Sequence, residues 1–191
     1  MTGLRERKKA AIRQAVHETA LRLAVERGID NVTIDEIAEA AGISRRSFSN
    51  YFTGKEDALI HPDGQQIRAI VDAVRTRPPG EPAWAAMRAV IRGIVREDEQ
   101  TVQGWAIRTR LALQHPAILA VQLGKHAALE RDLAGVVAER DGVDPVRAQV
   151  LATAFLAGLR IALRRWIQEE LTAHPADIIE QVLDEMEKPF T

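Results

Sequence analysis

Two arginines and two small polar residues stand together at the start of a short predicted helix. Arg45, Arg46, Ser49 and Asn50 follow Ser44, on the side of the segment that faces away from its apolar residues. An arginine can bind a guanine edge through two hydrogen bonds, and the first residues of a helix in the major groove reach base edges. This cluster therefore indicates the readout of DNA.

Two short helices joined by a tight turn, from Val32 to Lys55, must position this cluster. Thr33 and Glu36 have the types and the spacing of a capping box at the start of the first helix. Gly42 ends that helix, because glycine adopts the left-handed conformation of a C-terminal cap. Ser44 then begins the second helix. The aromatic residues that can pack it on the first helix are Phe48, Tyr51 and Phe52.

Helices are also predicted on both sides of this pair. A helix from about Glu6 to Arg27 precedes it and ends at Gly28, and we expect it to pack across the pair. Thr53 and Glu56 predict a further capping box, with Lys55 in the first turn of the helix that follows.

This stretch resembles the DNA-binding domain of the TetR family of bacterial repressors. The matching residues are the T-I-D-E-I-A-E-A-A-G-I-S run, then F-x-x-Y-F-x-x-K, preceded by a helix that ends E-R-G. They cover roughly Lys8 to Leu59. The resemblance implies a helix-turn-helix bound to double-stranded DNA. The alternative is a small packing unit whose arginines only face solvent.

One residue departs from the family pattern, since Ser49 stands where the family usually has an aromatic residue. Arg45 and Arg46 would then carry more of the base readout. The resemblance and the helix N-termini imply phosphate contacts by a second group of residues. We expect Arg45, Arg46 and Ser49 against bases, and Thr33, Ser44, Ser47, Asn50, Tyr51 and Lys55 against phosphates.

The composition sets limits on the function. The chain has 191 residues, 46% of them apolar, a net charge of −1 and no cysteine. Disulfides, thiolate metal sites and cysteine nucleophiles are thereby excluded. No apolar run approaches the ~20 residues of a membrane span, so a cytoplasmic protein is expected. The basic N-terminal residues, which could lie near the DNA backbone, are Arg5, Arg7, Lys8, Lys9 and Arg13.

A break is predicted in the fourth helix. The helix reads from Gly54 to about Ile60 and then meets His61-Pro62-Asp63-Gly64, whereas in most family members it runs on. Proline removes a helical hydrogen bond and clashes with the preceding turn. We expect a separate helix from about Gln65 to Val74. The predicted domains are residues 1–54, which bind DNA, and residues 55–191, which bind an effector and dimerise.

The rest of the chain also has helical periodicity, and no window alternates like a strand. The predicted fold is all-α, and the last three helices are expected at about Pro116–Arg140, Asp144–Leu171 and Ala176–Glu187. In TetR-like proteins the last two long helices form the dimer interface. The residues expected there are Leu163, Ile179 and Val182, although the core of a single subunit would produce the same pattern.

The C-terminal half resembles TetR members of the mycofactocin-regulator type, some of which respond to acyl-coenzyme A thioesters. The matching patterns are R-x-R-L, H-P-A-I-L, a helix ending A-E-R-x-G, and A-F-L-A-G-L-R-I-A-L-R-R-W. The resemblance implies a pocket for a small effector, apolar or anionic. The expected lining is Trp84, Met87, Ile91, Trp105, Arg108, Leu119, Leu123, His126 and Phe155, with Arg110 and Arg160 as further polar groups. Each arginine could equally pair with a glutamate or face solvent.

Groups for catalysis are absent from the sequence at usable spacing. The five histidines are scattered, and there is no HExxH, Walker loop or GxGxxG. We therefore expect no enzyme, no cofactor and no metal site, and predict a homodimeric transcriptional repressor that a small effector releases from a (pseudo)palindromic operator. One alternative is a DNA-binding regulator whose C-terminal domain recognises a protein, and another is a helical enzyme or carrier.

Overall fold

Helices account for all the regular structure in the described parts of the chain, which are residues 3–61, 63–169 and 173–188 of the computed structural model. The all-α prediction is confirmed. The N-terminal elements are α1 (Leu4–Arg27), the short 3₁₀ helix η1 (Ile29–Asn31), α2 (Ile34–Ala40), α3 (Arg45–Ser49) and α4 (Lys55–Leu59). The C-terminal elements are α5 (Asp63–Arg75), α6 (Ala83–Glu97), α7 (Glu99–Gln114), α8 (Pro116–Asp141), α9 (Pro145–Gln168) and α10 (Pro175–Met186).

Local signals in the sequence set the ends of α2 and α3. The capping box at Thr33 is present, with the Glu36 amide donating to the Thr33 hydroxyl at 3.2 Å and the Glu36 carboxylate accepting from the Thr33 amide at 2.8 Å. Gly42 has φ of 67° after α2, where a residue with a Cβ would be strained. Ser44 caps α3 by accepting from the Ser47 amide at 3.1 Å.

The cap before α4 differs from the predicted one. Thr53 donates from its amide and its hydroxyl to Asp57, at 3.0 and 3.2 Å, rather than pairing with Glu56. Gly54 is the N-cap residue, so the prediction of a Thr53–Glu56 box was wrong. The sequence offered two acidic residues one position apart, and only the path of the chain decides which of them points back.

The fourth helix is broken, as predicted. α4 ends at Leu59, Ile60 and His61 are not helical, and α5 begins at Asp63. Pro62 itself, the residue on which the prediction rested, lies outside the described residues. A short α4 and a separate α5 therefore replace one continuous connecting helix.

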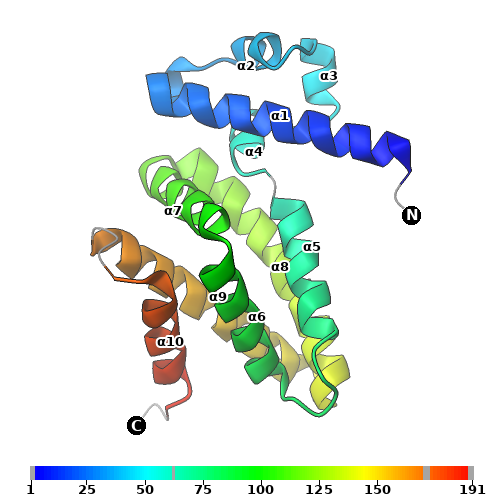
Figure 1. The fold of residues 1–191 in the computed structure, drawn as a ribbon, viewed down its shortest axis with the longest axis vertical. Coiled ribbons are helices and arrows are strands. Elements are labelled where there is room, and N and C mark those ends of the chain that lie inside the picture. The colour runs from blue at the N-terminus through cyan, green and yellow to red at the C-terminus, as the bar shows by residue number, and fades with distance from the viewer. Residues whose placement is uncertain (1–2, 62, 170–172, 189–191) are drawn as a thin grey trace.

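The N-terminal domain packs on a shared core that includes α4. α1 runs across α2 and α3 (Figure 1), and its Val16 and Leu23 lie in one buried cluster with Ile37 and Phe48. The same cluster also contains residues of α4, the residue after it, and residues of α7 and α8, which are Ala58, Leu59, Ile60, Ala112 and Ile118. The helix turn between α7 and α8 thus enters the core of the N-terminal domain. The division after residue 54 stays a prediction about which parts fold independently.

The C-terminal domain is a bundle in which α8 packs along α9, and α10 packs on α9 and α6. Prolines begin three of its helices, at Pro116, Pro145 and Pro175, where the missing N–H costs no hydrogen bond. Helix α9 is long and apolar enough to span a membrane by length and composition alone. Its buried residues, Phe155 and Trp166 among them, instead belong to the core of the bundle.

Two arginines fasten this bundle across long distances in sequence. Arg140 of α8 donates to five backbone carbonyls around the C-terminal end of α5 and the loop before α6, from Val74 to Glu81, at 2.8–3.3 Å. Arg88 of α6 binds Glu180, Asp184 and Glu187, which ties α10 to α6. Both networks hold the walls of the bundle in place.

Candidate functional site

The polar face of α3 is exposed to solvent, because Phe48 on the opposite face is buried in the core of the N-terminal domain. Phe48 is 1% exposed and packs against Phe52 at 5.4 Å between ring centroids. Arg45, Arg46, Ser49 and Asn50 are all exposed. The four residues predicted to face DNA therefore lie on one accessible surface of the helix-turn-helix.

Intramolecular hydrogen bonds hold part of this surface in place. Arg45 forms an ion pair with Asp35 of α2, in which both side chains are more than half exposed. The Ser44 and Ser47 hydroxyls lie 2.9 Å apart, and the Thr33 hydroxyl donates to Glu36 at 2.8 Å. The ion pair with Asp35 thus occupies the Arg45 guanidinium, while no ion pair joins exposed Arg46 to another of the described residues.

Lys55 begins α4, and its side chain turns back to the N-terminal domain. Its ammonium donates to the carbonyl oxygens of Ile29 and Val32 at 2.8 and 2.9 Å, and the side chain is partly buried. These hydrogen bonds give Lys55 a structural role at the carbonyl end of η1, and its phosphate contact stays a prediction. The sequence could not place it, because its partners lie 26 and 23 residues earlier.

The basic N-terminal residues flank the same domain. Tyr51 is half-buried, and the Arg13 guanidinium lies 6.0 Å from its ring centroid, as in a cation–π contact. Arg5, Arg7 and Lys8 are exposed on the first turns of α1. Their position gives the start of α1 a positive surface.

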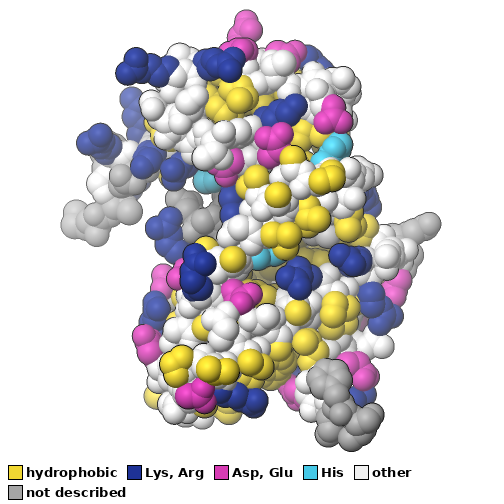
Figure 2. All heavy atoms as spheres, turned by 180° about the vertical axis from the view of Figure 1, so that it is seen from behind, with side chains coloured by type: hydrophobic (Ala, Val, Ile, Leu, Met, Phe, Trp, Pro, Cys, Tyr) yellow, Lys and Arg dark blue, Asp and Glu magenta, His cyan; other side chains and the backbone are white. Residues whose placement is uncertain are grey.

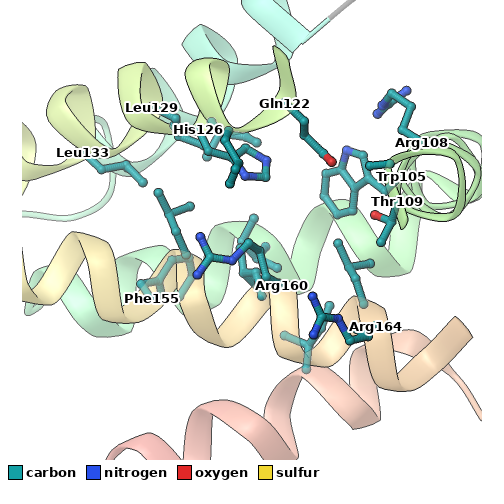
Figure 3. A pocket seen from close by; sticks show the side chains of 18 of the residues that line it. Trp105, Arg108, Thr109, Gln122, His126, Leu129, Leu133, Phe155, Arg160 and Arg164 are labelled. Carbon is teal, nitrogen blue, oxygen red and sulfur yellow. The ribbon is translucent and has the colours of Figure 1, made fainter. Parts of the chain in front are cut away.

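A cavity of about 160 Å³ opens within the C-terminal bundle, among α5 to α10. It contains eight of the nine predicted effector residues: Met87, Ile91, Trp105, Arg108, Leu119, Leu123, His126 and Phe155. Figure 3 shows side chains of α7, α8 and α9 converging on it. Leu119 and Leu123 are 41% and 47% exposed, so they form an open mouth.

Trp84 is the predicted lining residue that the cavity does not contain. Its ring meets Phe155 edge-on at 5.5 Å between centroids, and its indole N–H donates to Glu187 at 2.6 Å. It supports Phe155 from outside the cavity. Arg110, predicted as a further polar group, is exposed and also does not line it.

Residues that were not predicted to line the cavity complete its wall. The clearest signal for them was helical spacing: Gln122, Leu129 and Leu133 continue the α8 line through Leu119 and His126, and Arg164 stands one turn after Arg160. The other added residues are Ile70, Val74, Thr109, Ala112, Leu113, Leu156, Leu159, Leu163 and Ile179.

The residues predicted to form dimer contacts lie inside the single subunit. Ile179 is 3% exposed and Val182 7%, both within the core of the subunit, and Leu163 lines the cavity. They face inward because α10 packs on α9. The face of α9 turned to solvent carries Val146, Val150 and Ile161, each at least 50% exposed. Figure 2 shows hydrophobic side chains gathered over the C-terminal half of the molecule on the opposite face from Figure 1.

The cavity shares a wall with the N-terminal domain. Ala112 lines the cavity and is also buried in the N-terminal cluster. Arg108, 6% exposed, leaves α7 on the side away from Arg160 (Figure 3). Burial, and to a lesser degree the charge of Arg108, lowers the pKa of His17 of α1. The His17 imidazole N–H in turn donates to the Ala58 carbonyl of α4 at 2.9 Å.

A second contact ties α4 to α8 beside this wall. Lys125 binds Asp57 at 3.0 Å, and both side chains are largely buried. Burial alone would raise the pKa of Asp57, but its hydrogen bonds from Thr53 and the Lys125 charge lower it. Lys125 lies next to cavity-lining His126 on α8, so one helix contacts both the cavity and the DNA-binding domain.

A helix-turn-helix with an exposed basic helix, joined to a helical domain with a cavity, defines a DNA-binding transcriptional regulator. Residues 17–60 match the model of the bacterial regulatory proteins of the tetR family, and residues 81–191 match the MftR C-terminal domain. The chain belongs to the tetR family of bacterial regulators, with a C-terminal domain of the MftR type. It is thus a transcriptional regulator and not an enzyme.

Two relatives align along most of the chain. The HTH-type transcriptional regulator TcmR of Streptomyces glaucescens is 31% identical over an alignment of 173 positions, which covers 86% of this chain and 76% of TcmR. The putative mycofactocin biosynthesis transcriptional regulator MftR of Mycobacterium tuberculosis is 26% identical over 170 residues, 86% of this chain and 84% of MftR.

Solved structures share the fold at lower identity. The FadR repressor of Thermus thermophilus, in complex with lauroyl-CoA, has a TM-score of 0.61 and 21% identity, covering 94% of this chain and 95% of that one. A regulator from Syntrophomonas wolfei has a TM-score of 0.68 and 19% identity, covering 92% of each chain. At these identities the likeness describes the fold alone.

Proposed function

We propose that this protein is a ligand-responsive repressor that binds a (pseudo)palindromic operator as a homodimer and is released by a small-molecule effector. The observation that carries the proposal is the open cavity, whose lining residue Ala112 is also buried in the core of the N-terminal domain. A ligand there would act on both domains at once. The cytoplasm, where bacterial DNA lies, is the proposed place of action.

The DNA contact is assigned to the exposed face of α3. Arg46 and Ser49 would read bases, with Arg45 once it leaves Asp35, and Ser44, Ser47 and Asn50 would contact phosphates. Two subunits would place their recognition helices in successive major grooves, about 34–36 Å apart or a multiple of it. An effector releases DNA if it binds better to a state of the dimer with another separation.

The homodimer is assigned to the solvent-facing side of α9. Its apolar residues Val146, Val150 and Ile161 lie along one line of the helix and remain accessible in the single subunit. A two-fold contact would bury this stripe against its own copy. The same helix also lines the cavity, so a ligand that shifts α9 would change the angle between the two subunits.

A small effector is favoured over a protein partner by the form of the cavity. It is mostly apolar, has a few convergent polar groups, and lies inside the bundle rather than across a flat surface. The T. thermophilus and Bacillus subtilis FadR structures hold lauroyl-CoA and stearoyl-CoA. Acyl-CoA thioesters are therefore among the first compounds to test.

The experiment is a release assay on DNA fragments recovered with the purified protein. Acyl-CoA thioesters and other apolar compounds are screened for those that lower operator affinity, measured by fluorescence anisotropy. We expect a released complex with wild type and a much weaker response from Leu159→Trp, which fills the cavity. Leu151→Trp, on the same helix outside the cavity, is the control and should respond like wild type. Equal release of both variants would contradict the cavity as the effector site.

A further inference from the structure

Two arginines at the mouth of the cavity have no acidic partner among the residues that the structure describes. Arg160 and Arg164 lie one turn apart on α9 and both line the cavity. Both are exposed, and no ion pair or hydrogen bond joins either to another of the described residues. The neighbouring Arg165, in contrast, binds Glu169 at 3.0 Å. Figure 3 shows both arginines rising from α9 toward α7 and α8.

The charged side chains that line the cavity are all positive among the described residues. Among the described lining residues there are three arginines and no aspartate or glutamate. Burial first, and then the charge of Arg160, lowers the pKa of His126 across the cavity, which keeps that imidazole neutral at pH 7. The remaining polar groups are Thr109 and Gln122, which can offer hydrogen bonds without charge.

An organic anion fits this arrangement better than a neutral compound. Guanidinium groups present forked N–H donors that match a carboxylate, sulfonate or phosphate, and charge-assisted hydrogen bonds are stronger than neutral ones. Leu119 and Leu123 line the same cavity, so its exposed side also offers apolar surface to a ligand. The apolar body of the ligand would lie deeper, between Phe155 and Leu133.

We propose that Arg160 and Arg164 hold the anionic group of the effector, so that the cavity selects apolar compounds carrying a negative charge at one end. This inference rests on the proposed function, because it assumes that the cavity is the effector site. It adds the residues that select the ligand and the chemical class they select.

A matched pair of fluorescent probes tests the selection directly. 8-Anilinonaphthalene-1-sulfonate and N-phenyl-1-naphthylamine have the same apolar body and differ only in the sulfonate. Titration of each into the full-length wild type, at one site per subunit, should give at least about tenfold tighter binding of the sulfonate. In Arg160→Gln/Arg164→Gln the preference should vanish, while binding of the neutral probe stays unchanged.

Control variants separate charge from shape and from folding. Arg165→Gln, one residue further along α9, should keep the wild-type preference, and Arg160→Lys/Arg164→Lys should restore most of it. Sedimentation of the glutamine variant should equal that of wild type. A glutamine variant that changed the oligomeric state would overturn the proposal, since the arginines would then serve contact between subunits.

The outcomes also distinguish this inference from the proposed function. Equal binding of the two probes to wild type, or an undiminished preference in the glutamine variant, overturns the assignment of the arginines and leaves the cavity as a ligand site. Binding of neither probe contradicts the cavity itself, and with it the proposed effector response.

Discussion

Arg46 is the residue of the recognition surface that has the most freedom to meet a base. It is exposed, whereas its neighbour Arg45 is paired with Asp35. Replacing Arg46 by alanine should weaken specific DNA binding by roughly 1–3 kcal/mol and relax the preference at one base position. Anisotropy titrations on the recovered operator and on single-base variants measure both effects. Unchanged affinity for the operator and for every single-base variant would contradict the assignment of α3 to the major groove.

Lys55 illustrates the other role that a basic residue can have in this domain. Because its ammonium binds the Ile29 and Val32 carbonyls, Lys55→Ala should lower the free energy of unfolding by about 1–3 kcal/mol. The slope of log affinity against log salt should stay at its wild-type value. Urea unfolding and salt titrations test this together. If the slope fell by about one unit and the stability stayed unchanged, Lys55 would instead contact a phosphate.

Short-range signals decided which residue roles could be predicted from the sequence. Thr33, Glu36, Gly42 and Ser44 act within one turn of the chain, so their types alone specified the caps. The partners of Lys55 and of Arg88 lie more than twenty residues away and follow from the packing of whole helices. The choice between Glu56 and Asp57 at the α4 cap also failed, although both are near Thr53 in sequence, because the path of the chain decides which carboxylate points back.

The contact of α4 with α1 and α8 predicts a dependence of stability on pH. The rings of His61 and His17 lie 6.3 Å apart, near Lys125, Arg13 and Asp57. Burial, with the nearby positive charges, lowers the pKa of His61 to about 4. The unfolded chain therefore binds a proton near pH 6.5 that the folded chain takes up only near pH 4.

The sign of this effect follows from the depressed pKa. Stability from His61 is present above pH 6.5 and should fall by roughly 1–3 kcal/mol as the pH drops toward 4. In His61→Phe this part of the pH dependence should be absent. Urea unfolding of both proteins at pH 7.5, 6 and 5 measures it, and parallel losses would show that His61 does not contribute.

Helix boundaries were the most predictable feature at the scale of elements. Pro116, Pro145 and Pro175 began helices as their ring chemistry requires, and the break between α4 and α5 followed from the residues around His61. The sequence could not predict whether the apolar stripe of α10 packs inside the subunit or against a second subunit, because both arrangements bury such a stripe. Ile179 and Val182, which were predicted at the interface, are buried within the single subunit.

At the scale of the whole molecule, the exposed stripe on α9 should hold two subunits together. A glutamate in place of Val150, which is 52% exposed, would bury an unpaired carboxylate between subunits but leave the subunit core untouched. Val150→Glu should be folded by circular dichroism, monomeric in sedimentation and weak on the operator. Ile179→Glu, by contrast, should unfold the subunit. A Val150→Glu protein that remains a dimer would place the interface elsewhere.

The sequence predicted the apolar and basic character of the cavity lining, but it did not predict all the residues that form the lining. Apolar residues at helical spacing around Trp105 and His126 indicated a lining, and eight of nine assigned residues are in it. Trp84 was misplaced because its indole N–H finds Glu187, more than one hundred residues later. Arg164 was not predicted, although it stands one helical turn after Arg160 and therefore lies on the same face of α9.

Selection of DNA fragments by the purified full-length protein tests the central claim most directly. Wild type should enrich a single inverted repeat, with half-sites centred about 34–36 Å apart or at a multiple of that spacing. Arg46→Ala should lose the enrichment at one symmetric pair of positions, and Val150→Glu should recover no inverted repeat. Recovery of unrelated sequences by the wild type, with no repeat enriched, would contradict the account of this protein as a dimeric operator-binding regulator.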